Sequence, residues 1–176
     1  MLIHRRGGPR GRQRLKQRGV SGLEFALLST IFFAVFYAIL SYAFVMLLYQ
    51  GLTQAASEGA RSAVAVNRIA YSSDASYQIA AKAVATTTAK SALSWLPSDI
   101  LNYITSSGGI TSSIATSTVT VNTAGGNKAM AITTITVTVT YLDYANHPLL
   151  PLWSFPGLGS IPTVPPNLTG SATARI

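Results

Sequence analysis

The side chains that could perform acid–base or nucleophilic chemistry are few and scattered along the chain. His4 lies among arginines and His147 stands next to a proline, so each is better explained as a solvated residue than as a general base. Cysteine is absent, which excludes thiol catalysis, disulfides and cysteine zinc sites. The isolated acids are Asp74, Asp99 and Asp143, and Glu58 has only Arg61 nearby. This inventory predicts that the protein is not an enzyme and holds no cofactor and no metal.

The remaining acidic residue is Glu24, and it lies where an unpaired charge costs free energy. It immediately precedes residues 25–49, a run of 25 residues without a charge. An unpaired carboxylate costs roughly 2.5 kcal/mol or more near the middle of a bilayer, and less near its surface. Glu24 therefore needs either a charged partner or a shallow position in the membrane.

Residues 25–49 have the length and composition of a membrane-spanning helix. As a helix they would span roughly 38 Å, against a hydrocarbon core of roughly 30 Å. A cleaved secretory signal has a shorter apolar core, of roughly 7 to 15 residues, followed by a small-residue cleavage site. The run therefore predicts a membrane anchor.

Positive charge is concentrated before this run. Seven of the 13 lysines and arginines precede Gly19, and no acid lies among them. These seven are Arg5, Arg6, Arg10, Arg12, Arg14, Lys16 and Arg18. The positive-inside bias then places the N-terminus in the cytoplasm and the rest of the chain outside. An RNA-binding arm is the alternative for such a tail, but its position directly before the apolar run favours a topogenic flank, so no nucleic acid partner is expected.

The segment after the apolar run is predicted to continue the helix as a stem. It is rich in alanine and lacks proline as far as Ala70, which favours an amphipathic helix. Gly51 and Gly59 weaken helix formation locally.

A second helix is predicted from Asp74 to Leu96. Ser72 or Ser73 can cap its start, and Pro97 ends it. Apolar residues recur at roughly helical spacing within it, at Ile79, Ala83, Leu93 and Leu96.

Beyond Ser106 the sequence alternates between apolar β-branched residues and threonine, which predicts strands with one buried and one wet side. Val119 and Val121 share one face of residues 116–122. In residues 132–141 one face carries Ile135, Val137, Val139 and Tyr141, with Thr134, Thr136, Thr138 and Thr140 opposite. Residues 124–127 supply a glycine-containing turn that joins the two strands as an antiparallel hairpin.

The end of the chain is predicted to hold a loop and a further strand. Residues 147–166 are proline-rich and are expected to form an ordered or semi-ordered loop, because proline cannot donate to a strand ladder. Residues 167–176 could return to the sheet as a third strand.

Residues 19–25, which follow the basic leader, have the sequence GVSGLEF. They resemble the prepilin recognition site, in which a glycine is followed by four residues, a glutamate and an aromatic at the head of a long apolar helix. In that family a membrane aspartic peptidase cuts after the glycine on the cytoplasmic side. The resemblance implies a cut between Gly19 and Val20, with Glu24 and Phe25 serving peptidase recognition and subunit assembly.

The order of the segments along the chain resembles that of one particular group of pilin-like proteins. The motif, the stem sequence QAASEGARSA, the alternating strands, the proline-rich loop and the final SATARI are similar to TadE-like pseudopilins of the tight-adherence (Tad) pilus system. Gly22 departs from the family pattern, in which alanine is frequent at this position. The expected fold class is α+β and pilin-like: a long N-terminal transmembrane helix with a stem, and a second helix packed on a small antiparallel β-sheet.

The resemblance implies a structural role. The protein would be a minor pilin or pseudopilin that is cleaved in the cytoplasmic membrane and then helps to start, cap or assemble a thin adhesive fibre. Implied partners are a prepilin peptidase, the major pilin, a second TadE-like or TadF-like pseudopilin, inner-membrane platform proteins and membrane lipid. The chain would divide into a leader (1–19), a transmembrane assembly helix (20–50), a stem (51–72) and an extracytoplasmic domain (73–176).

Cleavage would supply the partner that Glu24 needs. The new α-ammonium at Val20 would lie one helical turn from the carboxylate, and the same group on a neighbouring subunit could approach it laterally. Glu24 would also lie in the first turn of the helix, where the helix dipole favours a negative charge.

Two other interpretations stay open. Glu24 could be an interfacial acid that caps the helix of an ordinary signal anchor. The outer domain could be a single-pass binding module that recognises an envelope ligand without entering a fibre.

Overall fold

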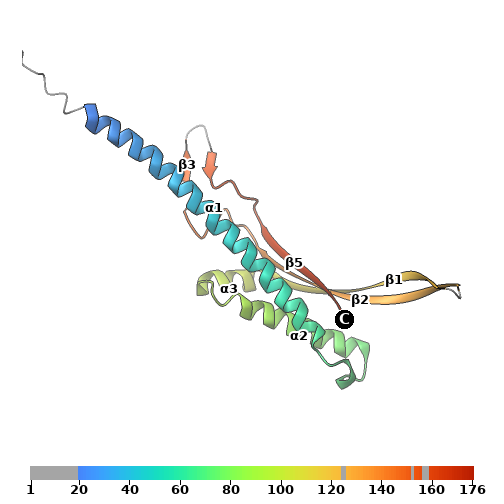
Figure 1. Ribbon diagram of the computed structural model, residues 1–176. Helices are drawn as coiled ribbons and strands as arrows, with labels where there is room; N and C mark the ends of the chain where they lie inside the picture. Colours follow the sequence, from blue (N-terminus) through green and yellow to red (C-terminus); the bar gives the residue numbers. More distant parts are fainter. Residues whose placement is uncertain (1–19, 124–125, 152, 156–158) are drawn as a thin grey trace, which may run out of the picture. The chain divides into compact units, whose positions relative to one another are not determined.

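The computed structural model describes residues 20–123, 126–151, 153–155 and 159–176. The chain divides into two compact units, residues 1–39 and residues 40–176 (Figure 1). Three α-helices, a short 3-10 helix and five strands follow one another along the described residues. The first helix is the long apolar one, and the strands form a small antiparallel sheet and a separate two-stranded sheet. The predicted α+β class is therefore confirmed.

Helix α1, Val20–Val64, includes the apolar run and most of the predicted stem. The stem was expected to reach Ala70, and this expectation is wrong by six residues. Beyond Val64 the chain turns and forms the 3-10 helix η1, Arg68–Ala70. The side chain of Asn67 accepts a hydrogen bond from the backbone N–H of Ile69, which stabilises the new turn and stops the α-helix.

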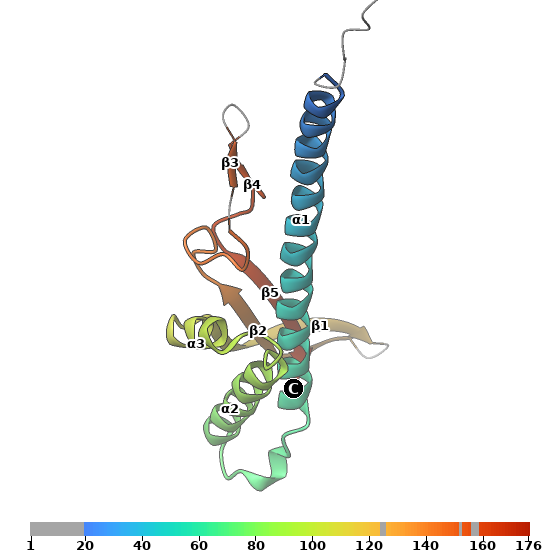
Figure 2. The same cartoon turned by 90° about the vertical axis from the view of Figure 1, so that its left-hand side faces the viewer.

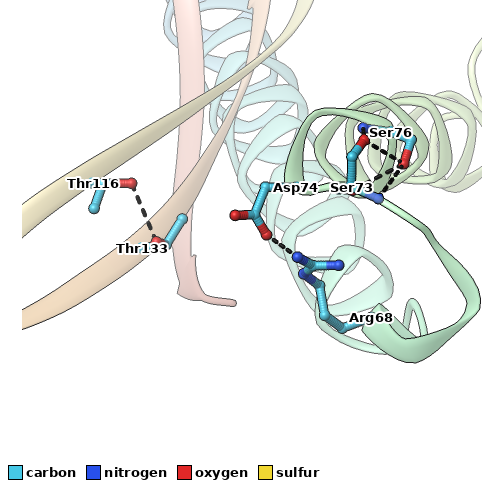
Figure 3. Close-up of polar contacts among 6 residues, drawn as sticks. All are labelled: Arg68, Ser73, Asp74, Ser76, Thr116 and Thr133. Atoms are coloured by element: carbon cyan, nitrogen blue, oxygen red, sulfur yellow. Dashed lines mark hydrogen bonds and ion pairs between the residues drawn. The ribbon is translucent and has the colours of Figure 1, made fainter.

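Helix α2, Asp74–Ala92, begins where the sequence predicts it. Ser73 is its N-cap, and the side chains and backbone of Ser73 and Ser76 bond reciprocally in a capping box (Figure 3). The helix ends four residues before the predicted Leu96. Pro97 is the N-cap of a further helix, α3, Ser98–Ser106, which was not predicted.

The buried face of α2 does not follow the apolar positions that recur in the sequence. Ile79 is 70% exposed and Ala83 is exposed as well, whereas Leu93 and Leu96 are buried. The helix buries a stripe spaced by four residues: Tyr77, Ala81, Ala85 and Ala89. The stripe lies against α1, since a Cβ on Gly59 would lie 2.7 Å from the carbonyl oxygen of Ala85 and 3.2 Å from the Cβ of Ala89.

The main sheet has the strand order β1-β2-β5 with antiparallel pairing throughout. The strands are β1, Ile110–Thr123, β2, Gly126–Tyr141, and β5, Leu168–Arg175. The third strand predicted at the end of the chain is therefore confirmed. The alternation in β2 is confirmed too, since Ile135, Val137 and Val139 are fully buried while the intervening threonines are partly exposed.

The outer half of the β1–β2 hairpin forms a two-stranded arm, residues 116–123 and 126–132. Strand β5 pairs with β2 only as far as Thr134, and Figures 1 and 2 show the arm continuing beyond the helices. Val119 and Val121 share a face as predicted, but they are 43% and 41% exposed because no element covers the arm. Residues 124 and 125 of the predicted turn lie outside the described residues, and Gly126 opens β2 with a φ of 112°.

The proline-rich segment contains a small sheet that was not predicted. Strands β3, Trp153–Phe155, and β4, Gly159–Ile161, pair in antiparallel register. The expectation of a loop without strands is wrong here because all the prolines of the segment fall outside these two short stretches, so none blocks the ladder.

Close backbone contacts join α1 to α2 and to the sheet. A Cβ atom on Gly59 would lie 2.7 Å from the carbonyl oxygen of Ala85, and one on Gly170 would lie 2.4 Å from the backbone nitrogen of Thr53. Both distances are far below van der Waals contact. Glycine at these positions therefore permits α1 to lie against α2 on one side and against β5 on another.

A cluster of aromatic rings closes the core where β2 ends. The ring centroids of Tyr141 and Tyr144 are 5.5 Å apart, and those of Tyr103 and Tyr141 are 5.8 Å apart. The Tyr141 hydroxyl donates to the carbonyl oxygen of His147. Burial, followed by the neighbouring Tyr144 and Tyr103, raises the pKa of Tyr141 to about 12.

The Gly170→Ala substitution tests the contact between β5 and α1. The added methyl group would meet backbone atoms that cannot move aside, so we expect the free energy of unfolding to fall by about 2–3 kcal/mol. Chemical denaturation of the full chain in detergent, followed by circular dichroism, measures this change. Gly22→Ala is the matched control because no atom lies within 4 Å of its Cβ position. Equal denaturation midpoints for the two variants would show that the contact does not constrain the fold.

The raised pKa of Tyr141 predicts a loss of stability at high pH. Its neutral form is favoured in the folded state, so the contribution is complete below pH 10 and is lost as the pH rises through about 12. The free energy of unfolding should fall by about 1–2 kcal/mol over this range, since solvent screens part of the effect of the raised Tyr141 pKa. The Tyr141→Phe variant should be less stable than the wild type by about 1 kcal/mol at neutral pH, because it lacks the hydrogen bond of the hydroxyl group. As the pH rises further, its free energy of unfolding should fall less than that of the wild type. Denaturation midpoints measured across this pH range would reveal parallel curves if the prediction were wrong.

Candidate functional site

The candidate site lies at the start of α1, around the predicted cleavage and assembly residues. Gly19 lies outside the described residues. Helix α1 begins at Val20, the residue that follows the predicted cut.

Glu24 is exposed on α1 and has exposed apolar neighbours. Leu23 is 70% exposed and Phe25 is 73% exposed. Within the part of the chain that the structure describes, Glu24 forms no hydrogen bond and no ion pair. The single chain thus leaves its carboxylate available for a partner from outside the described residues.

The expected helix-dipole effect on Glu24 needs a correction. The sequence predicted that this residue lies in the first turn, but the first turn of α1 holds no acid. Because α1 begins at Val20, Glu24 is its fifth residue. The attraction of the helix N-terminus for a negative charge falls off within the first turn, so a charged group must contribute more of the stabilisation than the dipole.

The part of α1 that belongs to the first unit of the chain is apolar on every side. Exposed large apolar residues occur all around residues 23–39: Leu23, Phe25, Leu27, Leu28, Ile31, Phe32, Phe33, Val35, Phe36 and Ile39. A helix that is hydrophobic all round belongs in a membrane or in a bundle of other helices. Helix α1 is long and apolar enough to cross a membrane.

Two hydroxyl groups in this part of α1, those of Ser29 and Thr30, are satisfied inside the helix. Ser29 donates to the carbonyl oxygen of Ala26 at 3.0 Å, and Thr30 donates to the same oxygen at 2.8 Å. Polar groups in hydrocarbon must find partners within the protein. These two residues therefore add little cost to membrane insertion and leave Glu24 as the costly group of the segment.

Gly22, the departure from the pilin pattern, has open space around it. Apart from the helix backbone around it, no atom of the described residues lies within 4 Å of the Cβ that alanine would carry there. Neither packing nor backbone conformation of the single chain requires glycine at this position.

A polar hollow lies in the larger unit, between η1, the start of α2 and the base of the arm. Its volume is about 430 Å³, and Arg68, Asp74, Tyr77, Gln78, Thr116 and Thr133 line it. Figure 3 shows Arg68 bonded to Asp74, and Thr116 bonded to Thr133 at 3.2 Å. The Arg68 guanidinium also lies 5.2 Å from the centre of the Tyr77 ring. The positive charge of Arg68 is therefore already paired with groups of its own chain.

The remaining polar residues make local structural contacts. The ring of His147 stacks on Tyr103 with centroids 4.2 Å apart, and the Glu58 carboxylate accepts a hydrogen bond from Gln54. Asp143 accepts from the side chain of Asn146. Across the described residues, no three of the histidine and acidic side chains gather in a group that could hold a metal ion.

One contact near the apolar run was not predicted. The Tyr42 hydroxyl accepts a hydrogen bond from the backbone N–H of Thr163 at 3.2 Å, and the two hydroxyl groups lie 3.0 Å apart. The two residues are 121 positions apart in the sequence. The contact could not be found from the sequence because neither residue carries a pattern that pairs it with the other.

Comparison with known proteins supports the resemblance at this site. Residues 19–61 match the family model of TadE-like protein. The match covers Gly19, Glu24, Phe25 and α1 as far as Arg61, which is about a quarter of the chain. No curated protein and no solved structure matches the chain. Residues 19–61 are thus similar to TadE-like proteins.

Proposed function

We propose that the protein is a TadE-like minor pilin or pseudopilin that takes part in the biogenesis of a Tad-type pilus. In this proposal α1 holds the chain in the cytoplasmic membrane, with its N-terminus in the cytoplasm, until a prepilin peptidase cuts between Gly19 and Val20. The cleaved subunit then helps to start, cap or assemble the fibre. Its partners are the peptidase, the major pilin, a second TadE-like or TadF-like pseudopilin and the inner-membrane platform.

The observation that carries this proposal is the isolated carboxylate in the TadE-like segment. Glu24 lies on an apolar, exposed stretch of helix and forms no bond within the described chain. A carboxylate in such surroundings gains most from an ammonium group brought close to it. A pilin-type cut would create that group at the first residue of α1.

The geometry of the helix sets how the new charge can act. Val20 and Glu24 are four residues apart, so the rise between them is roughly 6 Å and they lie on one face. The ammonium could pair with Glu24 of its own chain or with Glu24 of a neighbour. Pairing with a neighbour would join adjacent subunits inside the membrane, where competing water is scarce.

The rest of α1 supports assembly rather than catalysis. Among the described residues of their own unit, no element covers the apolar side chains of residues 23–39. Helices of other subunits could pack there once the chain leaves the lipid. A single-pass binding module is the competing function; it would use a pocket on the outer domain, but the described polar hollow already has its arginine paired with Asp74.

Gly19→Leu should block cleavage. A bulky side chain at the position before the cut would keep the leader attached, so the cell-derived protein would be heavier by 19 residues. Intact-mass spectrometry of the protein purified from cells with an active prepilin peptidase measures this. Gly22→Ala is the matched control and should be cut, because its Cβ meets no atom within 4 Å. A wild-type chain recovered with its leader intact would contradict the proposal.

Glu24→Ala should separate cleavage from assembly. Some cleavage should persist, but crosslinking to pilins and platform proteins should fall at least about tenfold, as expected for the loss of a charge-assisted contact. Crosslinking in membranes followed by mass spectrometry measures the loss. Glu58→Ala removes a carboxylate from the same helix where it contacts only Gln54 in the described chain, and should leave crosslinking unchanged. Equal crosslinking in both variants would favour a binding module.

A further inference from the structure

The outer edge of β1 is the longest free strand edge in the described part of the main sheet. Strand β1 lies at one end of the strand order, and β2 is its only partner among the described strands. The register with β2 gives every residue of β1 one partner, so the strand contains no bulge. A free edge presents a row of backbone N–H and C=O groups, which is a template for a further strand.

The register also shows which residues present these groups. The carbonyl oxygen of Gly109 accepts a hydrogen bond from the backbone N–H of Thr140 at 2.6 Å. Because backbone groups alternate in direction along an unbroken antiparallel strand, odd-numbered residues of β1 face β2 and even-numbered residues face outward. In the arm the outward-facing residues are Thr116, Thr118, Thr120 and Asn122.

Strand β1 lacks the features that keep strand edges apart. Proteins protect a free edge with a charged side chain, a proline or a bulge. Strand β5 carries Arg175, and the part of β2 that β5 does not reach carries Lys128. Arg175 also lies alongside that part of β2, since its Nη2 atom is 3.9 Å from the sulfur of Met130. The 14 residues of β1, by contrast, contain no charge and no proline.

We propose that β1 pairs edge to edge with β1 of a second copy of this chain. Charge favours this occupant, because two β1 strands bring no charged side chains together. Pairing of two copies through the free part of β2 would instead bring two Lys128 side chains together. Antiparallel pairing of identical edges about a twofold axis closes after two copies. The outer edges of the joined sheet are then the two β5 strands, where Arg175 opposes further growth.

A twofold axis at Thr120 gives a register that suits the side chains. Thr120 faces outward, so it can form a hydrogen-bonded pair with Thr120 of the second copy. Val119 of each copy then lies opposite Val121 of the other in a non-hydrogen-bonded pair, where side chains approach most closely. These valines are 43% and 41% exposed in the single chain, and Val119 is paired with Met130, which is 48% exposed. Pairing therefore gathers the exposed apolar side chains of two arms into one patch.

Pairing would also support the arm itself. Residues 116–123 and 126–132 form only two strands, as Figure 1 shows where the hairpin continues beyond β5. Three or more strands are needed for a sheet that is stable by itself. Two arms paired through β1 provide four.

The chain contains no cysteine, which permits a disulfide test in the full-length protein. Thr120→Cys places one thiol of each copy at the twofold axis. The Cα atoms of such a pair lie roughly 5.5 Å apart, within the range of roughly 4.4–6.8 Å for disulfides. Lys128→Cys is the matched control on the same exposed arm, but its two copies are separated by three strand spacings, at least roughly 14 Å.

Each variant is purified in detergent, oxidised and resolved on a non-reducing gel. Thr120→Cys should yield at least about tenfold more disulfide-linked dimer than Lys128→Cys, because only its thiols come within bonding range. Equal yields from the two variants would overturn the proposal, since dimers would then form by random collision or through another surface.

Thr120→Lys tests the same edge without a covalent bond. Two ammonium groups would lie opposite each other at the twofold axis, so the dissociation constant of the dimer should rise at least about tenfold. Sedimentation equilibrium in density-matched detergent measures this constant. Ala129→Lys is the matched control, because Ala129 is the exposed β2 partner of Thr120. Its two charges would lie beyond a Debye length of roughly 8–10 Å, so the constant should change less than about twofold.

A monomeric wild-type chain would overturn the proposal, and so would a dimer that Thr120→Lys weakens no more than Ala129→Lys does. Glu24→Ala changes the proposed assembly contact in the other unit and leaves β1 intact, so it should not alter the dimer. A failed dimer test therefore leaves the proposed pilin function standing, and a chain recovered with its leader intact leaves the dimer standing.

Discussion

The close contact of α1 with α2 and β5 is the constraint on which the larger unit depends. Gly59 and Gly170 remove the side chains that would hold these elements apart, and alanines fill the narrow space that remains. Small residues give little hydrophobic area each, so the contact gains its stability from many atoms at van der Waals distance. The sheet can reach the helix only because β2 presents its buried face, with Ile135, Val137 and Val139, to the same space.

This contact gives α1 two different surroundings. Its second half supplies one wall of a protein core, whereas residues 20–39 belong to a unit in which large apolar side chains have no cover. A single helix can serve both because its backbone hydrogen bonds are satisfied internally in either environment. Glu24 lies in the uncovered half and Gly19 directly precedes it in the sequence, which is where membrane and partner contacts are proposed, while the TadE-like match extends over both halves as far as Arg61.

Local sequence rules predicted the parts of the fold that local forces determine. The alternation in β2, the cap at Ser73 and the return of β5 all follow from side-chain period and hydrogen-bonding groups. The rules do not reach the features that packing decides: apolar spacing alone does not indicate that α2 buries its alanine stripe and leaves Ile79 exposed. Helix α3 was missed because nine residues give little periodicity, and Pro97 indicated an end and not a start. At the site, the isolation of Glu24 was predictable from charge pattern, whereas the Tyr42–Thr163 contact requires the folded chain.

The arm of the β1–β2 hairpin has a consequence for how the sheet opens. Between Thr134 and Val139, β2 has a neighbour on each side, while residues 126–132 are paired to β1 alone. A hairpin of two strands is only marginally stable in water. The amide hydrogens of the outer residues can therefore exchange with solvent through local fraying, whereas those of the inner residues exchange only when the core unfolds cooperatively. One continuous strand thus contains two regions whose amide hydrogens are protected to very different degrees.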